Sequence, residues 1–223
     1  MKSLLTRLLY LTAGLLLFAF GIVIMIKANV GYAPWEVFHA GLAYTIGISI
    51  GVASIIAGVV IVAIVTAFGE KLGLGTILSM ILTGVFIDLI MMLNIIPAAA
   101  ASFAAGLIML IIGLFVVSIG SYFYIKSAFG AGSRDNLMIV LNRKTRLPVG
   151  VCRSMVELAV TLAGWFLGGM IGIGTVFSVV IIGFCIQITF AIFKFNPASV
   201  QHETLKQTFN FIIKRVNDEL LRK

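Results

Sequence analysis

An internal repeat constrains this chain more than any other feature of its sequence. When the sequence is shifted by 99 positions, residues 14–88 align without a gap with residues 113–187. Each window contains 11 glycines and 8 of them coincide, whereas random placement gives about two coincidences. Glycine lacks a Cβ and marks backbone positions with special geometry. The matches therefore predict that the two halves share one backbone fold.

The composition places this repeated fold in a membrane. The chain is 61% hydrophobic, has a mean hydropathy of +1.17, and carries charge on only 11% of its residues, against about 25% in soluble domains. A helix needs about 20 apolar residues to cross a bilayer. We predict an all-α integral membrane protein with six transmembrane helices, the fifth of which is short unless it begins near Val149. The apolar runs occupy residues 8–26, 50–68, 74–93, 103–125, 154–167 and 175–193.

Basic residues predict the orientation, because short cytoplasmic loops collect Lys and Arg. With the N-terminus in the cytoplasm, 15 of the 16 basic residues lie on the cytoplasmic side and only Lys27 lies outside. Three spans per copy turn residues 1–98 and residues 99–194 into inverted repeats, followed by a cytoplasmic tail at 195–223. We expect a multi-pass protein of the bacterial inner membrane with both termini in the cytoplasm. Topology and anionic lipid then explain the net charge of +8 without a nucleic-acid partner.

A segment that is too short or too polar to cross lies between the first and second span of each copy. We predict that each segment forms a short re-entrant or interfacial helix. Glu36 and Asp135 occupy equivalent positions in the first turns of these helices, where the helix dipole stabilises a carboxylate by about 0.3–1 kcal/mol. Alternatively, both acids line a cavity and bind or gate a solute, with Arg134 as a partner for an anion or carboxylate.

A second shared motif begins the third span of each copy, as Gly73-Leu74-Gly75-Thr76 and Gly172-Ile173-Gly174-Thr175. Glycine permits close helix approach at these positions. A helix start also presents free backbone N–H groups that hold anions. Packing and ligand binding therefore both remain open for this motif.

Asp88 lies deep in the third span, and its repeat partner is the neutral Gln187. A charge inside the membrane costs about 2.5–3.5 kcal/mol, so such acids face a cavity or a partner. One interpretation is a proton- or cation-binding group in a symmetric site that includes Gln187. The equal alternative is a buried structural hydrogen bond, or a carboxylic acid kept neutral.

The remaining sequence features argue against catalysis. Cys152 and Cys185 have no spacing typical of a zinc site or a disulfide. The chain contains no His-Glu-x-x-His motif, no cluster of histidines or cysteines, and no evident pairing of a nucleophile with a base. We therefore expect no enzymatic activity, no metal and no cofactor.

The tail after residue 197 has apolar residues at helical spacing, which predicts an amphipathic cytoplasmic helix. Contact with the inner leaflet and contact in a homodimer are equal alternatives for its apolar face. These apolar residues are Leu205, Phe209, Ile212, Val216 and Leu220.

Four short motifs together resemble the YczE-type, YitT-related family of bacterial inner-membrane proteins. They are Gly31-Tyr32-Ala33-Pro34-Trp35-Glu36, Gly73-Leu74-Gly75-Thr76, Ser133-Arg134-Asp135-Asn136-Leu137-Met138 and Gly172-Ile173-Gly174-Thr175. The resemblance covers about residues 8–193 and departs from the expected pattern at Glu36, where an aspartate is expected. It implies a multi-pass membrane protein and brings no functional residues with it.

Inverted repeats recur in secondary transporters, where the two halves surround a central site. We therefore predict a small-solute or ion transporter or channel in the lipid bilayer. A membrane-embedded accessory or signalling protein, or the substrate-binding subunit of a multi-component importer, is the alternative. The candidate substrate-binding residues are Asp88, Gln187, Glu36, Asp135, Arg134, Trp35, Thr76 and Thr175.

Overall fold

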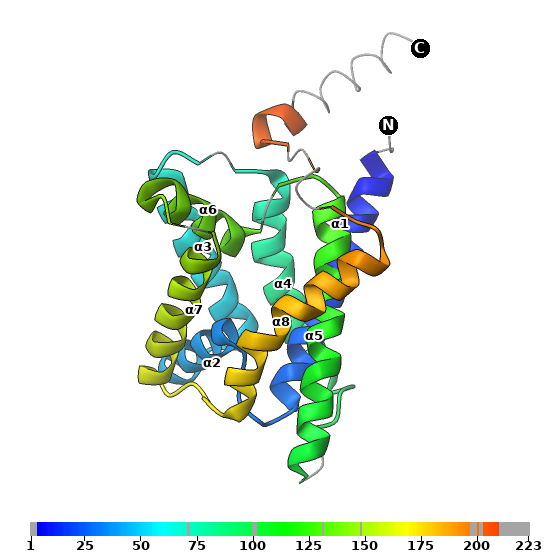
Figure 1. The fold of residues 1–223 in the computed structure, drawn as a ribbon, viewed down its shortest axis with the longest axis vertical. Helices are drawn as coiled ribbons and strands as arrows, with labels where there is room; N and C mark the ends of the chain where they lie inside the picture. Colours follow the sequence, from blue (N-terminus) through cyan, green and yellow to red (C-terminus); the bar gives the residue numbers. More distant parts are fainter. Residues whose placement is uncertain are drawn as a thin grey trace.

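The computed structural model describes residues 4–70, 72–99, 102–130, 132–147, 149–196, 200 and 203–209. These residues form an all-helical bundle without β-strands (Figure 1), which confirms that the fold is all-α. The helices are α1 (Leu4–Lys27), α2 (Pro34–Ile46), α3 (Ile50–Ala67), α4 (Leu74–Leu93), α5 (Phe103–Lys126), α6 (Ser133–Thr145), α7 (Val149–Phe166) and α8 (Ile173–Ile192).

Five of the described helices, α1, α3, α4, α5 and α8, are long and apolar enough to cross a membrane. The chain is therefore a multi-pass helical membrane protein. The apolar part of α7 is the shorter stretch Ser154–Phe166. The fifth predicted span, at residues 154–167, thus stays a prediction, as do the total of six spans and the division into two inverted repeats and a tail.

The helix bounds recur along the chain. α1 and α5 have 24 residues each, α2 and α6 have 13, α3 and α7 have 18, and α4 and α8 have 20. Each later helix begins and ends 99 positions after its counterpart. Local sequence sets these bounds: Pro34 opens α2, Gly47 ends it at φ +74°, and the Ser49 side chain caps α3 by accepting the N–H of Val52.

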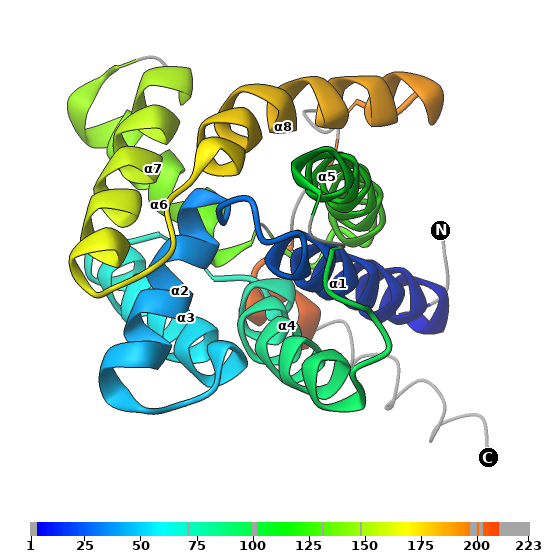
Figure 2. The same cartoon turned by 90° about the horizontal axis from the view of Figure 1, so that it is seen from below.

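α1 and α5 form the central pair, and glycines allow their backbones to touch. A Cβ at Gly14 would lie 2.9 Å from the carbonyl oxygen of Gly120, and a Cβ at Gly21 would lie 2.8 Å from that of Gly113. Later residues of α1 thus meet earlier residues of α5, so the two helices run antiparallel. Seen from below (Figure 2), α1, α4 and α5 lie on one side and α2, α3, α6 and α7 lie on the other, while α8 starts near α2 and runs along one edge of the molecule past α5.

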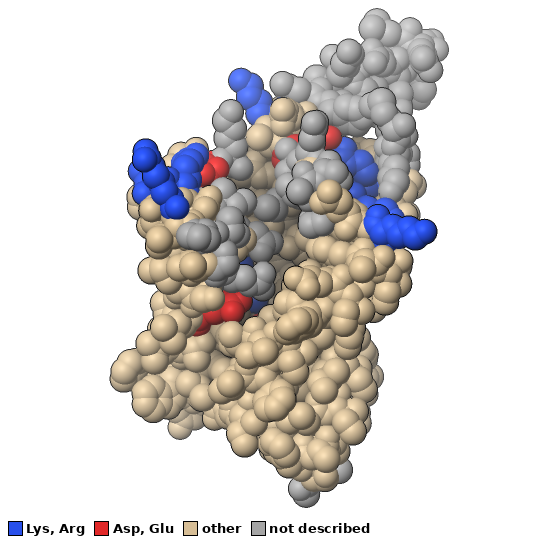
Figure 3. Space-filling model, viewed as in Figure 1, with Lys and Arg blue, Asp and Glu red and all other residues tan. Residues whose placement is uncertain are grey.

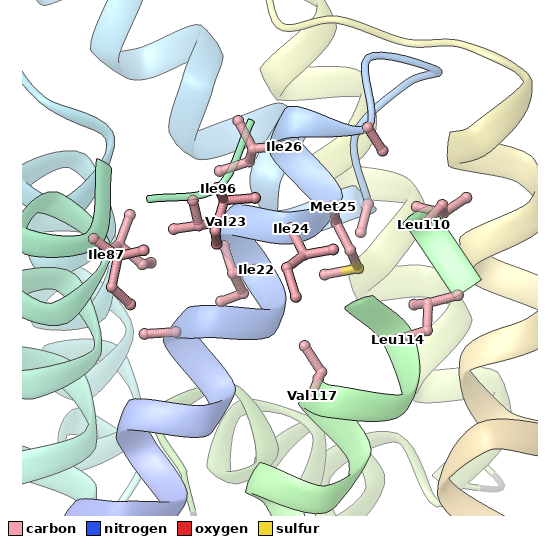
Figure 4. Packing of buried hydrophobic residues seen from close by; sticks show 14 of the residues in the cluster. Ile22, Val23, Ile24, Met25, Ile26, Ile87, Ile96, Leu110, Leu114 and Val117 are labelled. Carbon is pink, nitrogen blue, oxygen red and sulfur yellow. The ribbon is translucent and has the colours of Figure 1, made fainter. Parts of the chain in front are cut away.

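The largest core cluster surrounds the end of α1. Ile22 and its neighbours up to Ile26 pack between Ile87 of α4 on one side and Leu110 and Leu114 of α5 on the other (Figure 4). In lipid, close packing and van der Waals contact hold helices together, because lipid tails are as apolar as the side chains. This cluster and the glycine crossings therefore fix the centre of the bundle.

Tight glycine contacts join the two halves at both ends of the bundle. Gly31, at φ +113° before α2, lies against the start of α8, where its Cβ would be 2.6 Å from the nitrogen of Gly172. Gly130, at φ +129° before α6, lies against the start of α4, where its Cβ would be 2.8 Å from the Cα of Gly73. The recurring glycine motifs thus serve backbone approach between the halves.

Equivalent helices do not pack equally, despite their matching bounds. α3 packs along α4 at Gly51 and Gly84, and a Cβ at Gly84 would lie 2.5 Å from the carbonyl oxygen of Gly51. At Gly183, the counterpart of Gly84 in α8, no described atom of another helix lies within 4 Å of the would-be Cβ. α7 and α8 are therefore apart, whereas α3 and α4 are in contact (Figure 1).

The contact between α2 and α7 is closer than its counterpart between α6 and α3. A Cβ at Gly41 of α2 would lie 2.4 Å from the carbonyl oxygen of Gly164 in α7. The equivalent positions are Val140 of α6 and Val65 of α3, which meet through their side chains in an apolar cluster. Side-chain volume thus lets one end of the bundle close more tightly than the other.

The start of the tail is tied to the end of the bundle where α1 begins. The Arg7 guanidinium pairs with the Glu203 carboxylate at 2.7 Å, and the N–H of Leu205 donates to the carbonyl of Leu72 at 2.8 Å. Residues 205–209 are helical. The predicted continuation through Ile212, Val216 and Leu220 lies outside the described residues.

Candidate functional site

A cavity of about 420 Å³ lies inside the bundle, and residues from all eight described helices line it. Its lining is built largely from equivalent positions of the two halves, such as Leu15 with Leu114 and Ser79 with Ser178. One face of the molecule is hollowed, and acidic and basic side chains are visible within an otherwise uncharged wall (Figure 3). The cavity therefore lies where the two halves meet.

The first turns of α2 and α6 place charge in this cavity. Arg134 of α6 lies with its Nη1 3.5 Å from the Glu36 Oε1 of α2, and its guanidinium lies 4.8 Å from the centre of the Trp35 ring. The Glu36 side chain is only 4% exposed, and that of Arg134 is 25% exposed. Trp35 and Arg134 are equivalent positions of the two halves, so they stack where the repeats meet. The structure thus brings together three of the predicted site residues.

Two further titratable side chains, His39 and Glu157, complete the charged end of the cavity. His39 of α2 is 1% exposed, and its Nδ1 has no hydrogen-bond partner within the described part of the chain. Burial raises the pKa of Glu36, although the nearby Arg134 charge acts against this rise, and Glu157 of α7 adds a small upward effect. Burial and the Arg134 charge both lower the pKa of His39 well below its usual value, so the imidazole is neutral at pH 7.

Hydroxyl groups also line the cavity, and the sequence did not indicate them as site residues. Ser79 and Ser178 donate to the carbonyls of Thr76 and Thr175 and keep lone pairs available. Ser54 of α3 and Thr83 of α4 are both buried and add two further hydroxyls to the lining. The recurrence of Ser79 as Ser178 was the sequence signal for this wall.

Asp88 does not line the cavity. Its carboxylate accepts hydrogen bonds from the Ser49 hydroxyl at 2.5 Å and from the backbone N–H of Gly51 at 2.8 Å. These contacts cap the start of α3, which favours the structural interpretation of this acid. Gln187 is exposed on the outer surface of α8 and does not approach Asp88.

Thr76 and Thr175 are buried at the starts of α4 and α8 and also lie outside the cavity lining. Each hydroxyl accepts the backbone N–H of the glycine three residues before it, Gly73 or Gly172, at 3.4 and 3.1 Å. The packing interpretation therefore fits both motifs. Asp135 belongs to α6, and its side chain lies outside what the structure describes.

The described residues contain no group of three or more His, Cys, Asp or Glu side chains arranged to hold a metal ion. Cys152 and Cys185 are both buried and separate. The polar groups that converge are those of the cavity, and their chemistry suits a bound organic or ionic solute.

Comparison with known proteins shows which family the chain belongs to. Residues 5–190 match the profile of DUF6198, described as a family of unknown function. The chain belongs to this family. It is 32% identical over 202 residues to the uncharacterized membrane protein YczE of Bacillus subtilis, with 90% of each chain covered. An uncharacterized protein of Haemophilus influenzae is 31% identical over 183 residues, covering 80% of this chain and 83% of the relative.

The uncharacterized protein YyaS of Bacillus subtilis is 26% identical over 183 residues, covering 81% of this chain and 90% of that protein. The predicted resemblance to YczE-type membrane proteins is confirmed. No solved structure gives a significant match to the chain. The fold and the cavity therefore have to be interpreted from this chain's own residues.

Proposed function

We propose that this DUF6198 protein moves a small solute across the membrane and binds it in the central cavity. The observation that most supports this function is the position of the cavity between two halves whose helices match in length and order. Secondary transporters place their substrate between inverted repeats in this way, with charged and polar groups at the starts of short helices. The ion pair of Arg134 and Glu36 at the starts of α6 and α2 fits that pattern.

Unequal packing of the two halves supports a carrier rather than a fixed pore. If the halves exchange their packing, α7 closes on α8 at Gly183 as α3 now closes on α4 at Gly84, and the contact of α2 with α7 loosens. Two states of equal internal geometry then expose the cavity to opposite sides of the membrane. Gly51 and Gly84, which pack together in the first half, recur in the sequence of the second half as Gly150 and Gly183.

We infer an inner-membrane location with the N-terminus in the cytoplasm, because the Lys and Arg residues follow the positive-inside pattern. The described state is then closer to open toward the cytoplasm, since the glycine contact of α2 with α7 closes the opposite end. α2 and α6 act as re-entrant helices that enter from opposite sides and meet at the ion pair.

Thiol labelling in oriented vesicles tests this function without knowledge of the substrate. Ser178→Cys and, separately, Ser79→Cys are introduced into a Cys152→Ser, Cys185→Ala background, and a membrane-impermeant thiol reagent is applied from either face. Alternating access predicts that each cavity thiol reacts from both faces. A thiol at the end of a membrane-spanning helix, introduced as Met92→Cys on the exposed end of α4, controls for leaky vesicles, because in intact vesicles it must react from one face only.

Labelling of both cavity thiols from one face alone would contradict the proposal. It would favour the alternative of a membrane-embedded accessory or signalling protein whose repeat is a scaffold. Partner capture by the tail would then be the next measurement.

A further inference from the structure

The Arg134 guanidinium has more hydrogen-bond donors than its described contacts occupy. A guanidinium has five N–H donors, and the described contacts of Arg134 are one N–O approach of 3.5 Å to Glu36 and a stack on Trp35. A distance of 3.5 Å is at the limit of a hydrogen bond. The fork of the guanidinium therefore retains donors for a ligand, and its geometry suits a carboxylate held by two bonds.

The carboxylates near Arg134 disfavour the binding of a ligand that carries only negative charge. Glu36 and Glu157 line the same cavity and interact electrostatically with each other. A ligand with only negative charge would meet both carboxylates, and a ligand with only positive charge would meet Arg134. A molecule that carries both charges a few atoms apart satisfies both, because its carboxylate approaches Arg134 while its cationic group approaches Glu36 and Glu157.

The uncharged part of the cavity lining indicates the size and polarity of the rest of the ligand. Most of the lining away from the charged end is apolar, including Phe18, Met80 and Ile182. The Nδ1 of His39 has no hydrogen-bond partner among the described residues, and the hydroxyls of Ser54 and Thr83 also line the cavity, so all three offer orienting contacts. The volume of about 420 Å³ lies low in the range of roughly 300–1,000 Å³ for small-molecule pockets, which favours a compact ligand.

Building on the proposed function, we propose that the cavity binds a small zwitterion with an apolar body, with Arg134 holding its carboxylate and Glu36 and Glu157 facing its cationic group. The class includes α-amino acids with aliphatic or thioether side chains. Trp35 holds the guanidinium plane in place and contacts the apolar body of the ligand.

Three probes that share one carbon skeleton test the contribution of each charged group separately. Leucine carries both groups, 4-methylpentanoate lacks the ammonium group, and 3-methylbutylamine lacks the carboxylate. Thermal unfolding of the full chain in detergent is measured with each probe, beside a panel of other α-amino acids and betaines, because a ligand that binds only the folded state raises Tm. We expect at least one zwitterion to raise Tm, and its two truncated analogues to bind at least about tenfold more weakly.

Variants assign the effect to the cavity. Arg134→Gln and the charge-neutral pair Arg134→Gln with Glu36→Gln are both expected to abolish the zwitterion effect, and the pair keeps the test valid if the single variant unfolds. Gln187→Ala, exposed on the outer surface of α8, is expected to retain it. Arg134→Lys keeps the charge without the fork and is expected to give intermediate binding.

The proposal is overturned if no zwitterion of the panel raises Tm, if a singly charged analogue binds as well as its zwitterion, or if binding survives the neutral pair. Thiol labelling of Ser178→Cys from both faces is measured without any ligand. Two-sided labelling together with failed zwitterion binding would reject this ligand class and leave the transport proposal standing, whereas one-sided labelling would reject transport itself.

Discussion

Asp88 shows how one acid side chain inside a membrane is made tolerable. Its two oxygens take the Ser49 hydroxyl and the Gly51 N–H, so its charge compensates donors at the start of α3. We predict that Asp88→Ala lowers the free energy of unfolding by about 1–2 kcal/mol, because the start of α3 loses its acceptors. Asp88→Asn keeps one oxygen acceptor and should lose less. Thermal unfolding in detergent measures both, with Gln187→Ala as the surface control. An Asp88→Ala protein of unchanged Tm that no longer labels from both faces would instead place Asp88 in transport.

The ion pair of Arg134 and Glu36 allows a second test with single residues. Arg134→Gln leaves the Glu36 carboxylate buried without its partner, so we expect a loss of about 1–3 kcal/mol in the free energy of unfolding. Adding Glu36→Gln removes the orphaned charge and should recover most of this loss. The readout is a double-mutant cycle from denaturation curves. Strictly additive losses would show that the two side chains do not interact.

At the level of helices, glycine pairs decide which neighbours can touch. A Cβ at Gly84 would lie 2.5 Å from a backbone oxygen of α3, whereas a Cβ at Gly183 meets no described atom of another helix within 4 Å. Gly84→Ala should therefore destabilise the protein by about 1–3 kcal/mol through overpacking, and Gly183→Ala should change its stability by less than about 0.5 kcal/mol. The matched pair is compared by Tm under identical conditions. Equal losses at both positions would mean that α7 and α8 pack as closely as α3 and α4.

For the whole molecule, the repeat predicted more than the single residues did. Shifting the sequence by 99 anticipated the two sets of four helices, because glycines and helix-start residues such as Pro34 act locally. It also pointed to the ends of the short helices, where Arg134 and Glu36 meet. The hydrogen-bond partners of Asp88 could not be predicted from the sequence, because Ser49 and Gly51 belong to the start of a neighbouring helix. Gln187 was grouped with it by symmetry, yet α8 turns that position outward.

The difference between the halves was also hidden in the aligned sequence. Gly41 and Gly164 align with Val140 and Val65, and only the packed structure reveals that each pair faces across one end of the bundle. The glycine pair permits backbone contact and the valine pair prevents it. The state that the molecule adopts therefore follows from residues that break the repeat rather than from those that keep it.

Exchange of packing between the halves is the central claim, and distances between spin labels measure it directly in lipid vesicles. One label pair is placed on α3 and α4 at Val60 and Val85, and the equivalent pair on α7 and α8 at Ala159 and Phe184, all of which are exposed. The account predicts two distances for each pair, one short and one long. In the state where the α3–α4 labels are close, the α7–α8 labels are far apart, and in the other state the reverse holds. It further predicts that Gly183→Val, which adds bulk where α7 must approach α8, removes the short distance from the α7–α8 pair. A single fixed distance for each pair, unchanged by Gly183→Val, would contradict the account.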